Sequence, residues 1–531
     1  MLESFRQLSL DPKLLITLAA VGTTTSSPAT WQDDIGYTAL KTRLGNLTPT
    51  GSGVGLTQVE SQQGANYLPE FSTSSPIAGT GGLLGKIITD ASALDTDSAI
   101  SSHARTVAGF CYSNNPEFSL ATGVSEIKAY EAQHWLDAGF LRPGQAEPLS
   151  ETSPIQNHSW IGSGSNTALR RFDFAIQRDR FVALVGLGND PEASFPDLLA
   201  SSYNAISVGR SDGLHSTGGT PADLDGPGRT KPEIVVPQSA TSWATAIASS
   251  AAALLLETAH GSNSLSAAAN PETIKAILMA GASKSPFDTW TRTPSRPVDH
   301  RFGAGQMNID NSHRILTSGK QPPGETNIPT SGWAHTRLVS SAPSSFSFTV
   351  PDGYRIAELT ASAAWNRSVI DSDPGPAFAP SPVLPNVALA LTYIAPQSAV
   401  SQTVGQSVSP VDNFEHLFLL NRPAGTYTIE ITTDRSTTVA LAWRYRLERE
   451  SPFTITSLFR IPSTGEIAIV WPASPGRFYT VQKSTDLKTW RAVPGSVSLP
   501  ASLPEMVFID NSPTPDLSYY RVTESSSQPA P

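Results

Sequence analysis

The chain of 531 residues is poor in cysteine and in charge, and it has no long apolar run. Its single cysteine, Cys111, cannot form an intrachain disulfide, which excludes an extracellular scaffold held together by disulfides but leaves bacterial secretion open. Only 15% of the residues are charged, compared with about 25% in average soluble domains. Because no apolar run reaches the roughly 18 residues that a membrane-spanning helix needs, we expect no membrane span.

Several binding motifs are also missing. The net charge is −10, and Lys and Arg form neither a run nor a stripe, so we expect no nucleic-acid partner. The glycine-rich segment 79–86 has the wrong spacing for a phosphate loop, and Ile87 replaces the hydroxyl residue that would reach Mg²⁺. No His-Glu-x-x-His motif supports a zinc peptidase, and no metal ligand is assigned.

What is present predicts several domains with real cores. Hydrophobic residues make up 39% of the chain, with 20 Phe and 10 Trp, and the length favours three or four domains of about 150 residues each. Residues 36–320 alternate short apolar runs with helical patterns, which is typical of an α/β domain with a mostly parallel sheet. Its candidate strands are Val54–Val59, Ile155–Trp160, Phe181–Leu187, Ala205–Val208 and Ile234–Val236.

The remaining segments flank this domain. In the N-terminal segment, 1–35, the apolar run Leu14–Val21 is either the core of a signal peptide or a buried helix. After a linker near residue 325, alternating apolar runs between Gly, Pro and Asn clusters predict two all-β sandwich domains and a short tail. The expected boundaries are 331–449 for the first sandwich, 451–524 for the second and 525–531 for the tail.

Ser242 is the residue with the most informative surroundings. It lies between a short apolar strand, Lys231–Pro237, and a run rich in Ala and Leu, Ala246–Ala259, which predicts a helix. A serine in the first turn of that helix has two interpretations. It is either an N-cap, which local sequence alone favours, or a nucleophile whose oxyanion benefits from the helix N-terminus.

Both segments resemble the subtilisin-like serine peptidases (subtilases, peptidase family S8). Lys-Pro-Glu-Ile-Val-Val-Pro is followed by Ala-Thr-Ser-Trp-Ala-Thr-Ala, close to the family pattern Gly-Thr-Ser-x-Ala-x-Pro. The family glycine is Ala240 here, and the family proline is Ala246. The resemblance implies a subtilisin-like sheet with helices on both faces, and it makes Ser242 the catalytic nucleophile.

His103 and Glu60 complete the triad that the resemblance implies. Ser-His-Ala-Arg-Thr-Val-Ala-Gly, ending at Gly109, is similar to the family motif His-Gly-Thr-x-Val-Ala-Gly, with His103 at the place of the base. The strand ending Gln-Val-Glu is similar to the family strand that ends in the catalytic Asp, so the acid is Glu60. Glutamate reaches about 1.5 Å further than aspartate. The alternatives are a surface histidine at a helix start and a strand-end glutamate in solvent.

The family resemblance also extends to the oxyanion and substrate sites. The strand ending Gly-Leu-Gly-Asn resembles the one whose asparagine donates to the oxyanion, so Asn189 takes that place, with a simple turn as the alternative. His-Ser-Trp-Ile-Gly resembles the strand that pairs with an extended peptide. The candidate substrate-binding residues are Ser159, Trp160, Ile161, Gly162, Gly186, Leu187 and Gly188, the last three lining a pocket for a sizeable apolar side chain.

Together the motifs imply a secreted or cell-envelope bacterial serine endopeptidase. It would act on a protein or peptide substrate as a monomer, through an acyl-enzyme and without a cofactor for the chemistry. Structural calcium is frequent in the family, but no ligands for it can be assigned here. The first sandwich resembles jelly-roll domains that follow secreted peptidases, and the second resembles a fibronectin-like module. The alternative is a catalytically inactive subtilase-like protein that serves in adhesion or in carbohydrate or protein binding.

Overall fold

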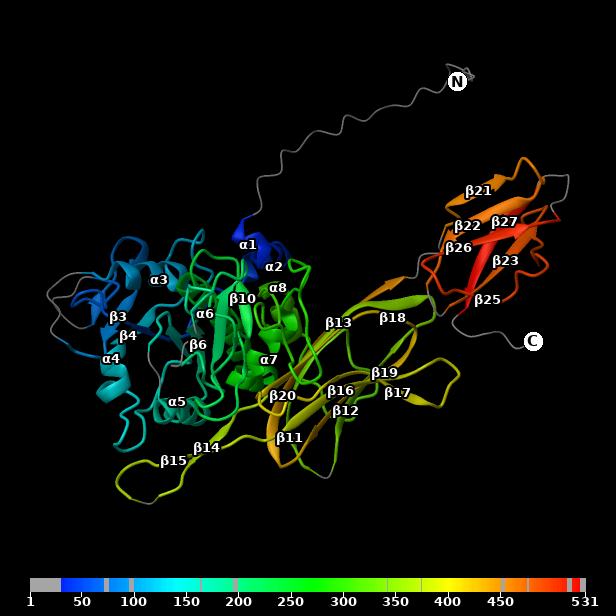
Figure 1. Ribbon diagram of the computed structural model, residues 1–531. Helices are drawn as coiled ribbons and strands as arrows, with labels where there is room; N and C mark the ends of the chain where they lie inside the picture. Colours follow the sequence, from blue (N-terminus) through cyan, green and yellow to red (C-terminus); the bar gives the residue numbers. More distant parts are fainter. Residues whose placement is uncertain are drawn as a thin grey trace, which may run out of the picture. The chain divides into compact units, whose positions relative to one another are not determined.

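The computed structural model describes most of the chain after residue 29. Described are residues 30–525 except 71–75, 95–99, 163–164, 194–198, 341, 374, 450–453, 475–476 and 513–517. The apolar segment 14–21 and the end of the tail, 526–531, therefore lie outside the described residues. The chain forms two compact units, Met1–Glu448 and Arg449–Pro531 (Figure 1).

An eight-stranded sheet is the centre of the first unit. Its order is β10-β7-β6-β5-β1-β4-β3-β2, and all its pairs are parallel except β2–β3. The strands are β1 (Leu56–Glu60), β2 (Ile77–Ala78), β3 (Ile87–Asp90), β4 (Glu126–Glu131), β5 (Ile155–His158), β6 (Val182–Gly186), β7 (Ile206–Arg210) and β10 (Ile234–Val236). The predicted α/β class with a mostly parallel sheet is confirmed.

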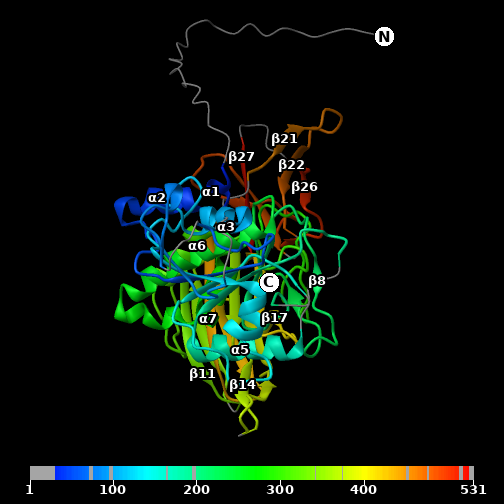
Figure 2. The ribbon, with the colours of Figure 1, turned by 90° about the vertical axis from the view of Figure 1, so that its left-hand side faces the viewer.

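Helices cover both faces of this sheet. The longer ones are α2 (Tyr37–Leu44), α3 (Ser102–Tyr112), α5 (Asn166–Asp179), α6 (Thr241–His260), α7 (Pro271–Gly281) and α8 (Ile309–Thr317). Short helical turns are α1 (Trp31–Asp34), α4 (Ala132–His134), η1 (Gly45–Leu47), η2 (Gly81–Leu83), η3 (Trp135–Gly139) and η4 (Asn263–Ala269), and a small ribbon pairs β8 (Gly218–Gly219) with β9 (Thr230–Lys231). In two views α3 lies beside α6 (Figures 1 and 2).

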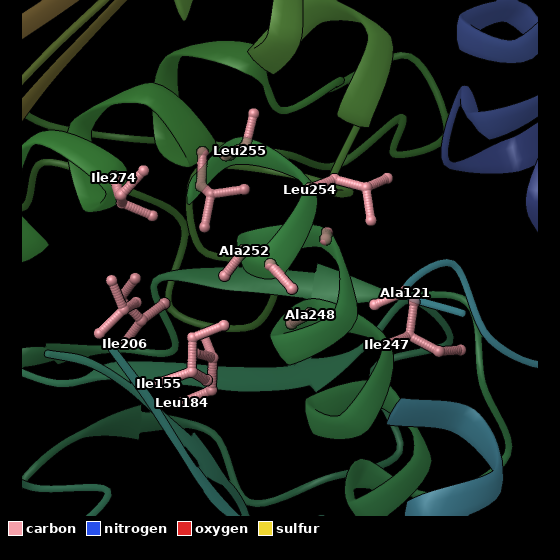
Figure 3. Packing of buried hydrophobic residues seen from close by; sticks show 14 of the residues in the cluster. Ala121, Ile155, Leu184, Ile206, Ile247, Ala248, Ala252, Leu254, Leu255 and Ile274 are labelled. Atoms are coloured by element: carbon pink, nitrogen blue, oxygen red, sulfur yellow. The ribbon is translucent and has the colours of Figure 1, made fainter. Parts of the chain in front are cut away.

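The sheet has a hydrophobic core on each face, because successive side chains along a strand point to opposite faces. In β6, Val182 and Leu184 join the core under α6, whereas Ala183 and Val185 join the opposite core with α5. The Ala- and Leu-rich α6 lies directly over the sheet, with its side chains on those of the strands (Figure 3). Each fully buried Leu or Ile contributes roughly 1.5–3 kcal/mol to the free energy of folding, so packing fixes the position of this helix. Its first turn lies at the carboxyl edge of the sheet.

A β-sandwich completes the first unit. Its two four-stranded sheets have the orders β11-β20-β13-β18 and β12-β19-β16-β17 and enclose a core that includes Trp365 and Trp443. A separate hairpin, β14–β15, packs along α5 (Figure 1). The strands are β11 (Ser331–Leu338), β12 (Ser344–Val350), β13 (Tyr354–Ala364), β14 (Ser368–Asp371), β15 (Pro380–Val383), β16 (Val387–Ile394), β17 (Ser401–Ser407), β18 (Phe414–Arg422), β19 (Gly425–Thr433) and β20 (Thr437–Arg449).

The second unit is all-β, as predicted. It has one sheet of order β21-β22-β26 and another in which β23 pairs with β24, β25 and β27, around a small core with Trp471 and Tyr479. The strands are β21 (Ser457–Arg460), β22 (Ile467–Pro472), β23 (Phe478–Ser484), β24 (Arg491–Ala492), β25 (Leu499–Pro500), β26 (Glu505–Asp510) and β27 (Tyr519–Ser525). In the described part of the chain, no helix has the length and apolar character needed to span a membrane.

The strand predictions need two corrections. The predicted strand Ile155–Trp160 ends at His158, so the segment after it has irregular backbone. Three strands of the sheet were also absent from the prediction: β2, β3 and, next to β1, β4, which has a buried residue at every second position. The strand β4 reads Glu-Ile-Lys-Ala-Tyr-Glu, and the polar residues in every second position dilute the apolar signal although the strand lies next to β1.

Candidate active site

Glu60 is the last residue of β1, in the middle of the sheet. The strand is paired on both sides, with β4 and with β5, so its backbone position is fixed. The Glu60 side chain is 1% exposed, and its Oε2 lies 2.7 Å from Nδ1 of His103. Its other oxygen, Oε1, accepts a hydrogen bond of 2.9 Å from Nε2 of Gln58. Glu60 is thus a buried carboxylate at the carboxyl edge of the sheet, and the interpretation as a solvent-facing glutamate is wrong.

His103 lies in the first turn of α3. The helix is capped by Ser101, whose hydroxyl accepts from the backbone N–H of Ala104 at 3.1 Å. Oε1 of Gln63 accepts from the backbone N–H of His103 and from the hydroxyl of Ser102, both at 3.0 Å. These bonds satisfy donors that the helix itself leaves free at its N-terminus, so they fix the direction in which the imidazole projects.

Ser242 is the second residue of α6, and Ala240 occupies the cap position. The interpretation of Ser242 as an N-cap is therefore wrong. Its Oγ lies 3.0 Å from Nε2 of His103 and 3.2 Å from the carbonyl oxygen of Ser159, so the hydroxyl has two acceptors within reach. Ala240 has φ −144° and ψ 146°, an extended conformation that any residue adopts, and the absence of the family glycine costs no backbone strain.

Burial and hydrogen bonding shift the pKa of both members of the pair Glu60–His103 above their ordinary values. Burial lowers the pKa of His103, but the hydrogen bond and the negative charge of Glu60 outweigh burial and raise it above its ordinary value of 6.5. Burial raises the pKa of Glu60 above its ordinary value, and the bonds from His103 and Gln58 offset only part of that shift. An imidazole with this partner accepts a proton more readily than a free one.

Asn189 follows β6 and is joined to the start of α6. Its Oδ1 accepts from the backbone N–H of Thr241 at 2.8 Å, and the Thr241 hydroxyl donates to the carbonyl oxygen of Leu187 at 2.6 Å. Because the amide oxygen is used in this way, the NH₂ end is the donor that remains. Within the described residues, neither this NH₂ nor the backbone N–H of Ser242 has a hydrogen-bond acceptor.

The candidate substrate-binding residues divide into two groups. Ser159 is tied to Ser242, since its hydroxyl donates to the Ser242 carbonyl oxygen at 3.1 Å, and Ile161 is 52% exposed after the end of β5. The side chains of Trp160 and Leu187 instead join the core on the α5 side of the sheet. From these two positions, only the backbone is left to contact a substrate.

The glycines proposed for the pocket are constrained by their neighbours. A Cβ at Gly186 would lie 3.2 Å from the Thr245 hydroxyl, so the space beside this glycine is taken by α6. The carbonyl oxygen of Gly188 accepts from the backbone N–H of Ser216 at 2.9 Å. Gly162, which belongs to the predicted peptide-pairing segment and not to the pocket, has irregular backbone after β5. The pocket expected beside Gly186, Leu187 and Gly188 stays a prediction.

Sequence reasoning missed three residues around Glu60, His103 and Ser242. Gln58 bonds to Glu60, Gln63 bonds to the first turn of α3, and the Trp243 ring lies 5.3 Å from the His103 ring, tilted by 34°. Gln58 had one usable signal, because residues two apart on a strand point to the same side. In the described part of the chain, no group of three or more His, Cys, Asp and Glu is placed to hold a metal ion.

Comparisons with known proteins add distant likenesses. No protein-family model matches the chain. No curated protein matches it either. Among solved structures, fervidolysin from Fervidobacterium pennivorans, described as a keratinolytic enzyme related to subtilisin, is 14% identical with a TM-score of 0.32, over 87% of this chain and 74% of that one. Sphericase is 15% identical with a TM-score of 0.33, over 51% of this chain and 97% of its own.

Tripeptidyl peptidase 2 is a longer protein found in the same comparison of solved structures. It is 10% identical with a TM-score of 0.29, and the match covers 80% of this chain. The chain spans about half the length of that protein, 51%. The fold class therefore rests on the sheet order and the helices described above.

Proposed function

We propose that the chain is a serine endopeptidase of the subtilisin type with a Glu-His-Ser triad. The observation that carries the proposal is the unbroken line of contacts from the Glu60 carboxylate through both ring nitrogens of His103 to the Ser242 hydroxyl, at 2.7 and 3.0 Å. A nucleophile, a base within hydrogen-bond distance and a third group that orients the base are the parts that acyl transfer needs.

In the proposed reaction, Ser242 attacks the carbonyl carbon of the scissile peptide bond. Nε2 of His103 takes the hydroxyl proton and later gives it to the leaving amine. Glu60 holds the proton on Nδ1, which keeps Nε2 free to accept, and its negative charge stabilises the imidazolium that forms. Water then attacks the acyl-enzyme with the same base, which restores Ser242.

The negative charge on the carbonyl oxygen would be held by two donors. They are the NH₂ of Asn189, which the bond from Thr241 holds in place, and the backbone N–H of Ser242 in the first turn of α6. The extended substrate would lie along the backbone of residues 159–162 by strand addition. We extend the proposal to a secreted or cell-envelope protein that acts as a monomer on protein or peptide substrates.

A fluorophosphonate probe tests this function, because it reacts only with an activated serine. We expect labelling of the folded protein at Ser242, loss of labelling in Ser242→Ala, and normal labelling in the control Ser239→Ala. Ser239 is an exposed serine three residues before the nucleophile. Unlabelled wild type with intact folding would refute the peptidase and favour the inactive, binding-protein alternative.

A further inference from the structure

Gln58 links the strand of the acid to the helix of the base. It lies two residues before Glu60 on β1 and is 1% exposed. Its Nε2 donates to Oε1 of Glu60 and to the backbone carbonyl oxygen of Ala104, both at 2.9 Å. Ala104 follows His103 in the first turn of α3, so one amide group bonds to both partners of the proposed acid–base pair.

Tyr112 fixes the orientation of this amide. Its hydroxyl, at the other end of α3, donates to Oε1 of Gln58 at 2.5 Å. Burial raises the pKa of Tyr112 well above its ordinary value, so the phenol keeps its proton and stays a donor near neutral pH. The NH₂ of Gln58 must then face Glu60 and Ala104, and both of its N–H groups have an acceptor.

A glutamate at position 60 needs such a partner more than an aspartate would. The extra methylene adds one rotatable bond, and a carboxylate held by a single hydrogen bond to Nδ1 could rotate out of line. The second bond, from Gln58 to Oε1, fixes the other oxygen. Because a glutamine two residues earlier projects from the same side of the strand, β1 supplies both the carboxylate and its support.

We propose that Gln58 is a positioning residue: it holds the Glu60 carboxylate in line with His103 and fixes β1 to the first turn of α3. The inference rests on the proposed peptidase function and adds a requirement that the triad alone does not contain. Gln58 itself touches neither the nucleophile nor a substrate in this scheme.

The titratable groups that interact with Glu60 are His103, Cys111 and Tyr112. Burial raises the pKa of the Cys111 thiol and of the Tyr112 phenol, so both stay neutral, and only His103 changes charge near neutrality. A new carboxyl group at position 58 would therefore change the pH profile in a recognisable way.

The test compares three variants by the second-order rate of fluorophosphonate labelling between about pH 5 and 9, with the melting temperature as a check on folding. Gln58→Met keeps the volume and removes the hydrogen bonds. Gln58→Glu keeps one donor only while it is protonated. The matched control is Gln156→Met on the neighbouring strand β5, since Gln156 is also buried and donates to a carboxylate, at 2.6 Å from Glu151.

We expect Gln58→Met to be labelled roughly 10- to 100-fold more slowly than wild type, because it loses one hydrogen bond to a charged group. The control Gln156→Met should be labelled at the wild-type rate. Gln58→Glu should approach the wild-type rate at acidic pH and lose labelling as pH rises, because the ionised carboxylate repels Glu60. Wild-type rates in Gln58→Met, or equal slowing in both methionine variants, would overturn the inference.

The outcomes stay separable from those of the proposed function. Unlabelled wild type refutes the peptidase, whereas labelled wild type with an unaffected Gln58→Met refutes only the positioning role. Should Gln58→Met fail to fold, Gln58→Glu decides alone, since a pH profile with the wild-type shape would contradict the proposal.

Discussion

Shortening the acid is the most demanding test of the proposed triad. Glu60→Asp restores the residue that the family pattern carries, yet we expect it to reduce activity in this chain. The backbone of β1 is held by pairing on both sides, so the shorter side chain withdraws the carboxylate by about 1.5 Å. The contact to Nδ1 of His103, now 2.7 Å, would open to about 4.2 Å, beyond hydrogen-bond distance.

The size of the effect follows from the bond that is lost. A hydrogen bond to a charged group contributes about 1.5–3 kcal/mol, which corresponds to a decrease in kcat of roughly 10- to 150-fold. KM should stay nearly constant, since Glu60 does not contact the substrate in the proposed reaction. Glu60→Gln should lose more, up to about 10⁴-fold, because it removes the charge and allows the wrong tautomer of His103.

The assay is hydrolysis of a chromogenic peptide under saturating substrate, with fluorophosphonate labelling as an independent measure of nucleophilicity. Glu60→Asp at or above the wild-type kcat would refute the reasoning, because it would mean that β1 or α3 moves to close a gap of this size. Wild-type activity in Glu60→Gln would remove Glu60 from the triad altogether.

Three further predictions follow from the contacts of the site and its core. Glu60 raises the pKa of His103 above 6.5, and only the neutral imidazole accepts a proton, so kcat/KM should decrease as the pH is lowered, with a midpoint above pH 6.5. In Glu60→Gln this midpoint should move to lower pH, and an unmoved midpoint would contradict the pairing of Glu60 with His103. Asn189→Ala should lower kcat by about 10²- to 10³-fold, and a change confined to KM would argue against an oxyanion role. Ser250→Ala should lower the free energy of unfolding in urea by about 1–3 kcal/mol, because the buried backbone N–H of Leu120 loses its acceptor while that of Ala121 keeps the Ser119 hydroxyl. A stability equal to wild type would show that water replaces the Ser250 hydroxyl.

Much of the central sheet and the helix α6 were predictable because their signals are local. Apolar runs identified β6 and β10, and the Ala- and Leu-rich sequence identified α6. The polar alternation of β4 hid a strand that is buried only on one side. The role of Ser242 could not be assigned from local sequence alone, because local sequence favours an N-cap and only the resemblance of the flanking motifs pointed to a nucleophile.

The support of the triad was not predictable for a different physical reason. Gln58 and Gln63 act through contacts with residues about 40 positions away, at Ala104 and at His103. A glutamine in a strand or a loop carries no periodic signal, and the length of its side chain allows many partners. Only the pairing of β1 with its neighbours and the docking of α3 decide which partner it meets.

Three departures from the family pattern, at positions 60, 240 and 246, are each accommodated by the structure around them. Ala240 stands in extended backbone, where a side chain is tolerated, and Ala246 lies inside α6, where it has the N–H that a proline would lack. Glu60 is longer than an aspartate, but β1 ends so that its Oε2 reaches Nδ1 at 2.7 Å, with Gln58 on the other oxygen. None of the three changes removes a group that the proposed reaction uses. Departures from a pattern therefore do not by themselves favour an inactive protein, and the labelling of Ser242 decides between the two functions.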